Sequence, residues 1–241
     1  MTAETWPNLV TMFFDQAAEK RDAPFLWAKT DGTYHDFSWS QAASIIEALA
    51  HGLKAAGVNP GDRVVLISEN RPEWLMADMA IMAAGGISVP AYTTNTTADH
   101  VHILSDSGAV GVIVSNDRLA KSLIPAAEQV ESAKFIVGID ALSDTGTGTL
   151  QSHTWASMTD SNDKEGTIKE EAQSLKRTDT ACIIYTSGTG GAPKGVLLSH
   201  GAILHNCAGS ADAIEPLGLD DNVFLSFLPL SHSYEHMAGP F

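Results

Sequence analysis

Residues that could bind a phosphate group gather in one segment, Cys182 to His200, which reads CIIYTSGTGGAPKGVLLSH. Within it, hydroxyl residues and glycines fill the positions from Thr186 to Gly191, and Lys194 follows shortly after. Glycines let backbone N–H groups converge on an anion, hydroxyls add donors, and a lysine brings a mobile positive charge. The segment therefore predicts a loop that holds a phosphate group.

Other glycine-loop motifs do not fit this segment. A Walker A loop needs serine or threonine directly after Gly-Lys, whereas Lys194 lies between Pro193 and Gly195. A dinucleotide fingerprint beginning at Gly188 would need glycine at position 193. A nucleophile elbow around Ser187 would need glycine at position 185, which is tyrosine. An ordinary turn would require neither the hydroxyls nor the lysine, so a phosphate loop of another class is the best interpretation.

A second constellation, FLPLSHSYEHMAG, occupies positions 227–239. Its residues His232 to His236 fit the H-x-x-E-H pattern of one group of zinc hydrolases, and on a helix the two histidines would lie one turn apart. A catalytic zinc ion needs a third protein ligand, and the sequence offers no obvious one nearby. Zinc hydrolysis is therefore kept as a remote alternative, and no metal ligand is assigned.

The elements that must position these residues follow a βαβ pattern. Short apolar runs alternate with segments of helical periodicity, and these runs lie at 63–68, 86–92, 109–114 and 134–139. Apolar strands separated by helices predict an α/β fold, in which a mostly parallel sheet is flanked by helices. Asn70, with Pro72 and Glu73 behind it, predicts the N-cap of the helix that follows the first of these strands.

Turn and loop signals organise the rest of the chain. Asp31-Gly32 predicts a hairpin over residues 25–38, and a helix is predicted to follow it from 40 to 56, with Gly57 as its left-handed end. Residues 140–180 are rich in Ser, Thr, Asp and Gly and predict a surface excursion. Beyond it the sequence predicts strands and one helix, namely strands at 180–186, 195–200 and 222–230 and a helix at 201–213.

The composition excludes several classes of protein. The chain of 241 residues has 14 Lys and Arg against 29 Asp and Glu, a net charge of −15, which argues against a nucleic-acid binder that relies on bulk positive charge. Two cysteines, Cys182 and Cys207, form no CxxC pair, and both are predicted to be packing residues. The N-terminus lacks a basic signal region, and the longest apolar run, 79–91, is too short to span a membrane. A cytoplasmic location is expected.

With these residues in view, YTSGTGGAPKG closely resembles the signature YTSGTTGxPKG of the adenylate-forming (AMP-binding) superfamily. One specified position departs from it, because Gly190 stands where the family usually has threonine, and one hydroxyl contact is thereby lost. The stretch GVNPGDRVVLISENRPEWLMADMAIMAAGGISVPAYTTNT is also similar to the family. LPLSHSYEHM resembles the corresponding segment of long-chain fatty acyl-CoA synthetases.

The resemblance implies a two-step ligase reaction. A fatty acid carboxylate attacks the α-phosphate of MgATP, giving an acyl-adenylate and pyrophosphate, and the thiol of CoA then displaces AMP. It implies that the triphosphate is bound by Thr186, Ser187, Gly188, Thr189, Gly190, Gly191 and Lys194, with Thr186 and Lys194 as the catalytic pair. It also implies that His232, Tyr234 and Glu235 line the acid pocket and that His236 fills a basic position. The implied small molecules are ATP with Mg²⁺, fatty acid and CoA.

The resemblance further implies an incomplete N-terminal domain over residues 1–241. The family's Y-G-x-T-E and Y-x-T-G-D segments and its C-terminal domain are absent from this sequence. The expected division is a first α/β subdomain at 1–139, the surface excursion at 140–180, and the phosphate loop with the start of the acyl pocket at 181–241. The chain is expected to be inactive alone. A non-catalytic nucleotide- or acyl-binding fragment, another acid-CoA ligase, and peripheral association with the inner face of a membrane stay open.

Overall fold

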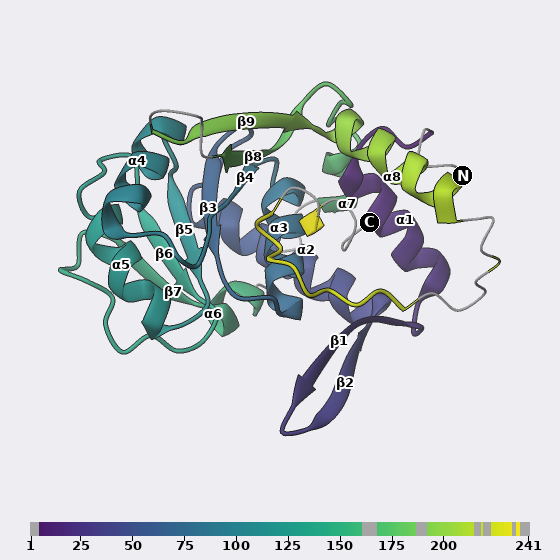
Figure 1. The fold of residues 1–241 in the computed structure, drawn as a ribbon, viewed down its shortest axis with the longest axis horizontal. Coiled ribbons are helices and arrows are strands. Elements are labelled where there is room, and N and C mark those ends of the chain that lie inside the picture. The colour runs from purple at the N-terminus through teal and green to yellow at the C-terminus, as the bar shows by residue number, and fades with distance from the viewer. Residues whose placement is uncertain are drawn as a thin grey trace.

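A seven-stranded sheet forms the centre of the molecule, with strand order β7-β6-β5-β3-β4-β8-β9 (Figure 1). The computed structural model describes residues 5–160, 168–186, 192–214, 218, 223–232 and 235–236. The strands of this sheet are β3 (Arg63–Ile67), β4 (Ile87–Pro90), β5 (Gly111–Val114), β6 (Phe135–Gly138), β7 (Gln151–Thr154), β8 (Thr180–Thr186) and β9 (Lys194–Ser199). Neighbouring strands are parallel except for β8 and β9. The predicted α/β fold is confirmed.

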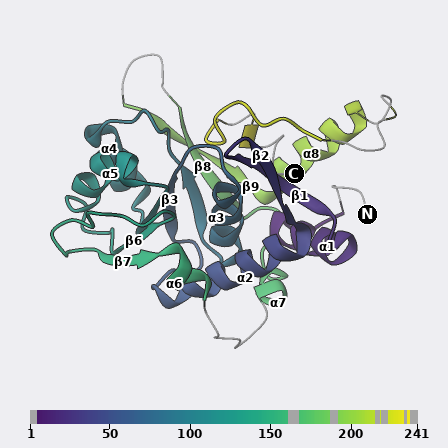
Figure 2. The same ribbon diagram turned by 90° about the horizontal axis from the view of Figure 1, so that it is seen from below.

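Helices cover both faces of this sheet (Figures 1 and 2). They are α1 (Leu9–Lys20), α2 (Trp39–Ala55), α3 (Pro72–Ala83), α4 (Thr97–Ser107), α5 (Asp117–Ala127), α6 (Trp155–Thr159), α7 (Ile168–Ala172) and α8 (His200–Ile214). Within the described ranges, no helix is long and apolar enough to cross a membrane.

Two buried clusters lie on opposite sides of the sheet because successive strand residues point to opposite faces. In β3, Val64 and Leu66 pack with α1, α2 and α3, whereas Val65 and Ile67 pack with α4 and α5. The β8 strand alternates in the same way, with Cys182 and Ile184 on the α3 side. The strands β3, β5 and β6 are therefore buried on both faces, which explains the continuous apolar runs in the sequence.

The predicted hairpin and helix at the start of the chain are confirmed. Strands β1 (Pro24–Thr30) and β2 (Thr33–Ser38) pair antiparallel and project from the body of the molecule (Figure 1). Asp31 and Gly32 both have positive φ, as a tight hairpin turn requires. Gly57 has φ +103° just after α2, where the left-handed conformation favours glycine.

The segment 140–180 contains three elements of its own. Strand β7 pairs with β6 and extends the sheet by one strand. Helix α6 follows β7 directly, capped by Thr154. Helix α7 buries Ile168 and Ala172 against the core. The stretch between α6 and α7 lies partly outside the described residues.

The predicted capping role of Asn70 is wrong. The residue at the N-cap of α3 is Arg71, which makes no side-chain capping bond. Asn70 instead bonds residues far along the chain: its amide nitrogen lies 3.1 Å from Ser226 Oγ and 2.6 Å from the Leu228 carbonyl oxygen. Its oxygen accepts from the Leu230 amide at 3.0 Å. The Asn70 side chain therefore bonds a segment about 160 positions away and does not cap α3.

The predicted strand at 222–230 is also wrong in its described part. Residues 223–230 are irregular and join no sheet. Val223, Leu225 and Phe227 are 82%, 73% and 73% exposed, respectively. An apolar run forms a strand only where a neighbouring strand pairs with its backbone, and periodicity alone does not reveal such a neighbour.

Candidate functional site

The β8–β9 hairpin holds the two ends of the predicted phosphate loop together. Thr186 ends β8, Lys194 begins β9, and the two are direct partners in the antiparallel register. Both residues are exposed. Residues 187–191, with Ser187, Gly188, Thr189, Gly190 and Gly191, lie outside the described residues. The structure thus places the hydroxyl of Thr186 and the ammonium of Lys194 at one exposed end of the hairpin.

Helix α4 supports both sides of this loop. On the entering side, the Tyr185 hydroxyl donates to Asp106 Oδ2 at 2.6 Å. On the leaving side, His102 Nε2 donates to the Pro193 carbonyl oxygen at 2.8 Å, and the His102 ring lies edge-on to Tyr185. Burial, together with the neighbouring Asp106 carboxylate, raises the pKa of Tyr185, so this hydroxyl stays protonated and keeps donating. Neither α4 residue has a local sequence signal, because the two contacts join positions 79 and 91 residues apart.

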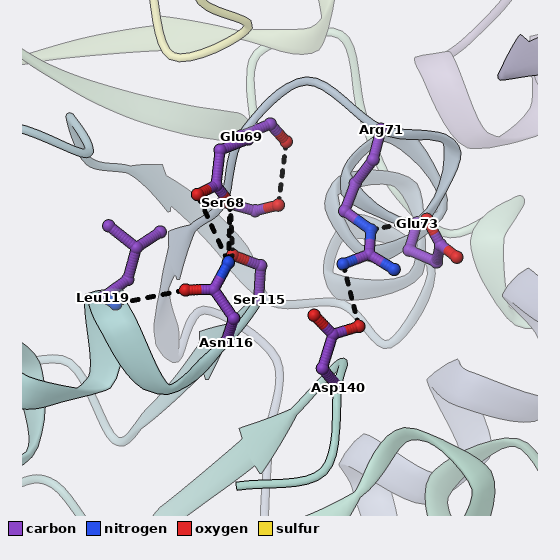
Figure 3. Close-up of polar contacts among 8 residues, drawn as sticks. All are labelled: Ser68, Glu69, Arg71, Glu73, Ser115, Asn116, Leu119 and Asp140. Carbon is purple, nitrogen blue, oxygen red and sulfur yellow. Dashed lines mark hydrogen bonds and ion pairs between the residues drawn. The ribbon is translucent and has the colours of Figure 1, made fainter. Parts of the chain in front are cut away.

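A polar cluster lies at the carboxyl edge of the sheet, where β3, β5 and β6 end (Figure 3). Glu69, just after β3, accepts from Ser115 Oγ at 2.6 Å, from Asn116 Nδ2 and from Arg118. Burial opposes the charge of Glu69, but these hydrogen bonds outweigh it and lower its pKa to about 2. Polar residues directly after two buried strands, SEN at 68–70 and SND at 115–117, are the signal that could have revealed this cluster.

The same edge also contains an arginine shared by two acids. Arg71 Nε lies 2.8 Å from Glu73 Oε2, and another guanidinium nitrogen lies 3.0 Å from Asp140 Oδ1 (Figure 3). In open α/β sheets, this edge between the strands at a topological switch point is the usual place for a ligand. Here the side chains bond to one another across the loops after β3, β5 and β6, so the cluster fixes these loops to each other.

The second constellation forms a turn against α3. The His236 amide donates to the His232 carbonyl oxygen at 2.9 Å, so the two histidines lie one helical turn apart. Glu235 and His236 are fully buried, and neither carboxylate oxygen of Glu235 has a hydrogen-bond partner in the described part of the chain. Tyr234 lies outside the described residues. The structure therefore brings His232, Glu235 and His236 together.

His236 is held on both sides of its ring. Its Nε2 lies 2.9 Å from Asp78 Oδ2 on α3, and its Nδ1 lies 3.8 Å from Cys182 Sγ on β8. The Trp74 ring packs edge-on against it with centroids 5.5 Å apart. Burial lowers the pKa of His236, but the charge of Asp78 and the hydrogen bond to it outweigh burial and raise this pKa to about 10.

This arrangement does not suit the zinc alternative. A zinc-bound histidine needs one free ring nitrogen, whereas both nitrogens of His236 are directed at protein groups. Among the described residues, no three His, Cys, Asp or Glu side chains are placed to hold a metal ion. The H-x-x-E-H pattern here therefore describes a turn with a buried ion pair.

Strand β8 links the two constellations. Cys182, which contacts His236, and Thr186 are four residues apart on this strand, and such a separation spans about 13 Å. Alternate residues share a face, so Thr186 lies on the α3 side with Cys182. Lys194, directly opposite Thr186, lies on that side too. The hairpin end and the turn therefore face the same side of the sheet.

Comparisons with known proteins give a consistent result. Residues 13–241 match the AMP-binding enzyme family. Long-chain-fatty-acid–CoA ligase FadD15 of Mycobacterium tuberculosis is 32% identical over 225 residues, which cover 93% of this chain and 36% of that protein. Long chain acyl-CoA synthetase 7 of Arabidopsis thaliana is 34% identical over 223 residues, which cover 86% of this chain and 30% of that protein. The chain thus spans about a third of the length of these relatives.

Solved structures share the fold. A putative long-chain-fatty-acid CoA ligase from Rhodopseudomonas palustris superposes with a TM-score of 0.74 at 22% identity, covering 97% of this chain and 55% of that one. A luciferase from Phrixothrix hirtus superposes with a TM-score of 0.76 at 18% identity, and the match covers 98% of this chain and 44% of the luciferase. The signature around Thr186 and Lys194, the sheet that presents it and the match over residues 13–241 together show that this chain belongs to the AMP-binding enzyme family.

Proposed function

We propose that this chain carries the phosphate loop and the start of the acid pocket of an AMP-forming acid–thiol ligase that acts on long-chain fatty acids. In the first step, a carboxylate oxygen attacks the α-phosphorus of ATP, and the bond to the bridging oxygen breaks, releasing pyrophosphate. In the second, the thiol of CoA loses its proton to solvent, its sulfur attacks the acyl carbon, and AMP leaves with the bonding electron pair. The observation that carries the proposal is the hairpin that sets Lys194 opposite Thr186 at the ends of the signature loop.

The role of the hairpin follows from where charge accumulates. The acid brings its own nucleophile, so the protein has to hold the triphosphate in line and stabilise the negative charge of the leaving pyrophosphate. Lys194 supplies a positive charge, Thr186 a hydroxyl donor, and the loop from Ser187 to Gly191 backbone N–H groups. Helix α4 supports the hairpin end on both sides, and this support is proposed to hold the lysine and the threonine next to the triphosphate.

Magnesium enters this proposal as part of the substrate. Mg²⁺ prefers oxygen ligands and commonly binds through the phosphates of a nucleotide and only one or two carboxylates. In this proposal the ion arrives with ATP, where it offsets phosphate charge.

The acid pocket is proposed to involve His232, Tyr234 and Glu235. The turn that carries His232 and Glu235 lies on the same side of the sheet as Thr186 and Lys194. Two relatives of this chain are named as ligases or synthetases of long-chain fatty acids or acyl groups, which favours a long acyl chain over an amino or aromatic acid. Cytoplasmic location, the use of CoA and the three-part division of residues 1–241 are parts of the same proposal.

A second candidate function is binding without catalysis. It is favoured by one observation: the chain spans about a third of its relatives. The two candidate functions can be separated by an assay of ATP–pyrophosphate exchange in the presence of palmitate. The assay is run on the 241-residue chain and on any longer product of the same reading frame. We expect palmitate-dependent exchange in the longer product and none in the 241-residue chain. Palmitate-independent or absent exchange in the longer product would contradict the ligase proposal.

A further inference from the structure

The last described part of the chain is fastened to the α3 region at two points. We call residues 226–232 with 235 and 236 the docked segment. At the first point, Asn70 bonds Ser226, Leu228 and Leu230 with its amide group. At the second, His236 meets Asp78 in the middle of α3. The described residues of this segment join no sheet, and these polar contacts, together with the buried side chain of Leu230, hold it against the core.

Asp78 is an unusual residue for its position. Apart from Asp78, all residues of α3 from Met76 to Ala83 are apolar and buried. The Asp78 side chain is 2% exposed, and its Oδ1 atom has no hydrogen-bond partner among the described residues. Burying a carboxylate costs several kcal/mol unless it is paired. Its contact with His236, 158 positions away, is therefore what makes an acid tolerable in this helix.

The imidazole of His236 contacts both α3 and strand β8 of the sheet. With a raised pKa it carries a proton on each nitrogen at neutral pH, so Nε2 donates to Asp78 and Nδ1 points at the sulfur of Cys182. One side chain thus links α3 to β8. Among the described residues, its ring contacts Asp78 and Trp74 from α3 and Cys182 from β8, and the buried Glu235 precedes it in the turn.

We propose that Asp78 is a positioning residue that acts through His236 to hold the turn bearing His232 and Glu235 against β8, on the side of the sheet where Thr186 and Lys194 lie. The identity of the pocket rests on the proposed function, whereas the fastening of the turn does not. Two other roles compete with this one. Asp78 could stabilise the whole fold without a local effect, or Cys182, His236 and Asp78 could form a nucleophilic triad.

The triad is excluded by access. The order sulfur, imidazole, carboxylate suits thiol chemistry, but Cys182 is 0% exposed and lies within the main buried cluster. A substrate could not reach this sulfur without displacing the docked segment. The same burial makes Cys182 an internal reporter, because a thiol reagent can label it only when His236 moves away.

The first test measures that movement. In a Cys207→Ser background, the rate of Cys182 alkylation is compared for the parent, Asp78→Asn and Ser88→Ala at neutral pH. Ser88 pairs with Cys182 across β4 and β8 and is equally buried, but its hydroxyl has no hydrogen-bond partner among the described residues, so it is the matched control. We expect labelling to rise by at least about tenfold in Asp78→Asn, since the buried imidazolium loses its partner, and to change less than about twofold in Ser88→Ala. Asp78→Glu should restore much of the protection.

Urea unfolding of the same variants separates positioning from general stability. If the labelling rate rises more than the global unfolding constant, the opening is local and the proposal is supported. If both rise by the same factor, Asp78 stabilises the whole fold and the proposal is overturned. An unchanged labelling rate in Asp78→Asn would overturn it as well.

The second test asks whether the fastened turn serves the acid. In a product that shows palmitate-dependent exchange, Asp78→Asn should raise the KM for palmitate at least about tenfold and leave the KM for ATP within about twofold, because the proposed function assigns the turn to the acid pocket and not to ATP. An equal rise in both KM values would contradict positioning of the pocket. Absence of palmitate-dependent exchange in the longer product without substitutions would contradict the proposed function alone, because the labelling rates are measured independently of activity.

Discussion

The two halves of the sheet are stabilised in different ways. Around β3, β5 and β6, the strands are buried on both faces, and the polar residues at their ends bond one another. Strand β8 is buried as well, but around β9 and in the docked segment large apolar side chains remain exposed, and long-range hydrogen bonds and one ion pair hold this region to the rest of the molecule. Four residues that make these contacts, Asn70, Asp78, His102 and Asp106, belong to the first half. The first half therefore acts as a scaffold on which the region proposed for chemistry is aligned.

The largest loss of stability is expected when a large buried side chain is removed from the core of the scaffold. Phe135 on β6 is 1% exposed, and its ring lies where a Cβ atom on Gly111 would be. Phe135→Ala should lower the free energy of unfolding by about 3–5 kcal/mol, because a cavity replaces the ring. Urea denaturation measures this loss. A loss under about 1 kcal/mol would mean that the scaffold is not the stable half.

A smaller effect is expected where α4 supports the hairpin. Tyr185→Phe removes the hydroxyl that donates to Asp106 and leaves that carboxylate without this donor. We expect about 1–2 kcal/mol of lost stability, together with faster hydrogen exchange at the hairpin end than in β3 or β5. Exchange measured by mass spectrometry on the two regions tests the contrast. Equal acceleration in both would contradict a local support role.

The charge of Glu69 should make a smaller contribution to the free energy of unfolding, and this contribution should depend on pH. Its pKa of about 2 lies below the ordinary value near 4.5, so its contribution to stability is present above about pH 4.5 and is lost as pH falls toward 2. Because the side chain is 41% exposed, Glu69→Gln should cost only about 0.5–1 kcal/mol at neutral pH. The difference between parent and variant should vanish near pH 2. A difference that grows on acidification would show that the sign is wrong.

The smallest effect is expected on the exposed apolar run. Phe227 is 73% exposed, so Phe227→Ser should change the free energy of unfolding by less than about 0.5 kcal/mol. Thermal unfolding of the 241-residue chain gives the measurement. A loss of unfolding free energy above about 1 kcal/mol would show that the Phe227 side chain is packed against the protein and not exposed.

Sequence patterns predicted the scaffold better than the site. Continuous apolar strands, the Asp31-Gly32 turn and the Gly57 helix end follow from local chemistry, and all were predicted. Asn70 was mistaken for a cap because its true partners lie about 160 positions away. Residues 222–230 were mistaken for a strand because periodicity does not report a missing neighbour. Lys194 and Thr186 were found through a local motif, whereas Asp78 and Asp106 act through distant contacts.

The most direct test of the account is the effect of Lys194→Ala on the two partial reactions of an active product. Lys29→Ala, in the projecting β1–β2 hairpin, is the matched loss of a lysine. If Lys194 stabilises the departing pyrophosphate, its loss should slow palmitate-dependent adenylation by about 100-fold or more. Transfer of the acyl group from preformed palmitoyl-adenylate to CoA should slow by less than about fivefold, because no pyrophosphate leaves in that step. Equal slowing of both steps, or no slowing of adenylation, would contradict the assignment of the β8–β9 hairpin as the phosphate site.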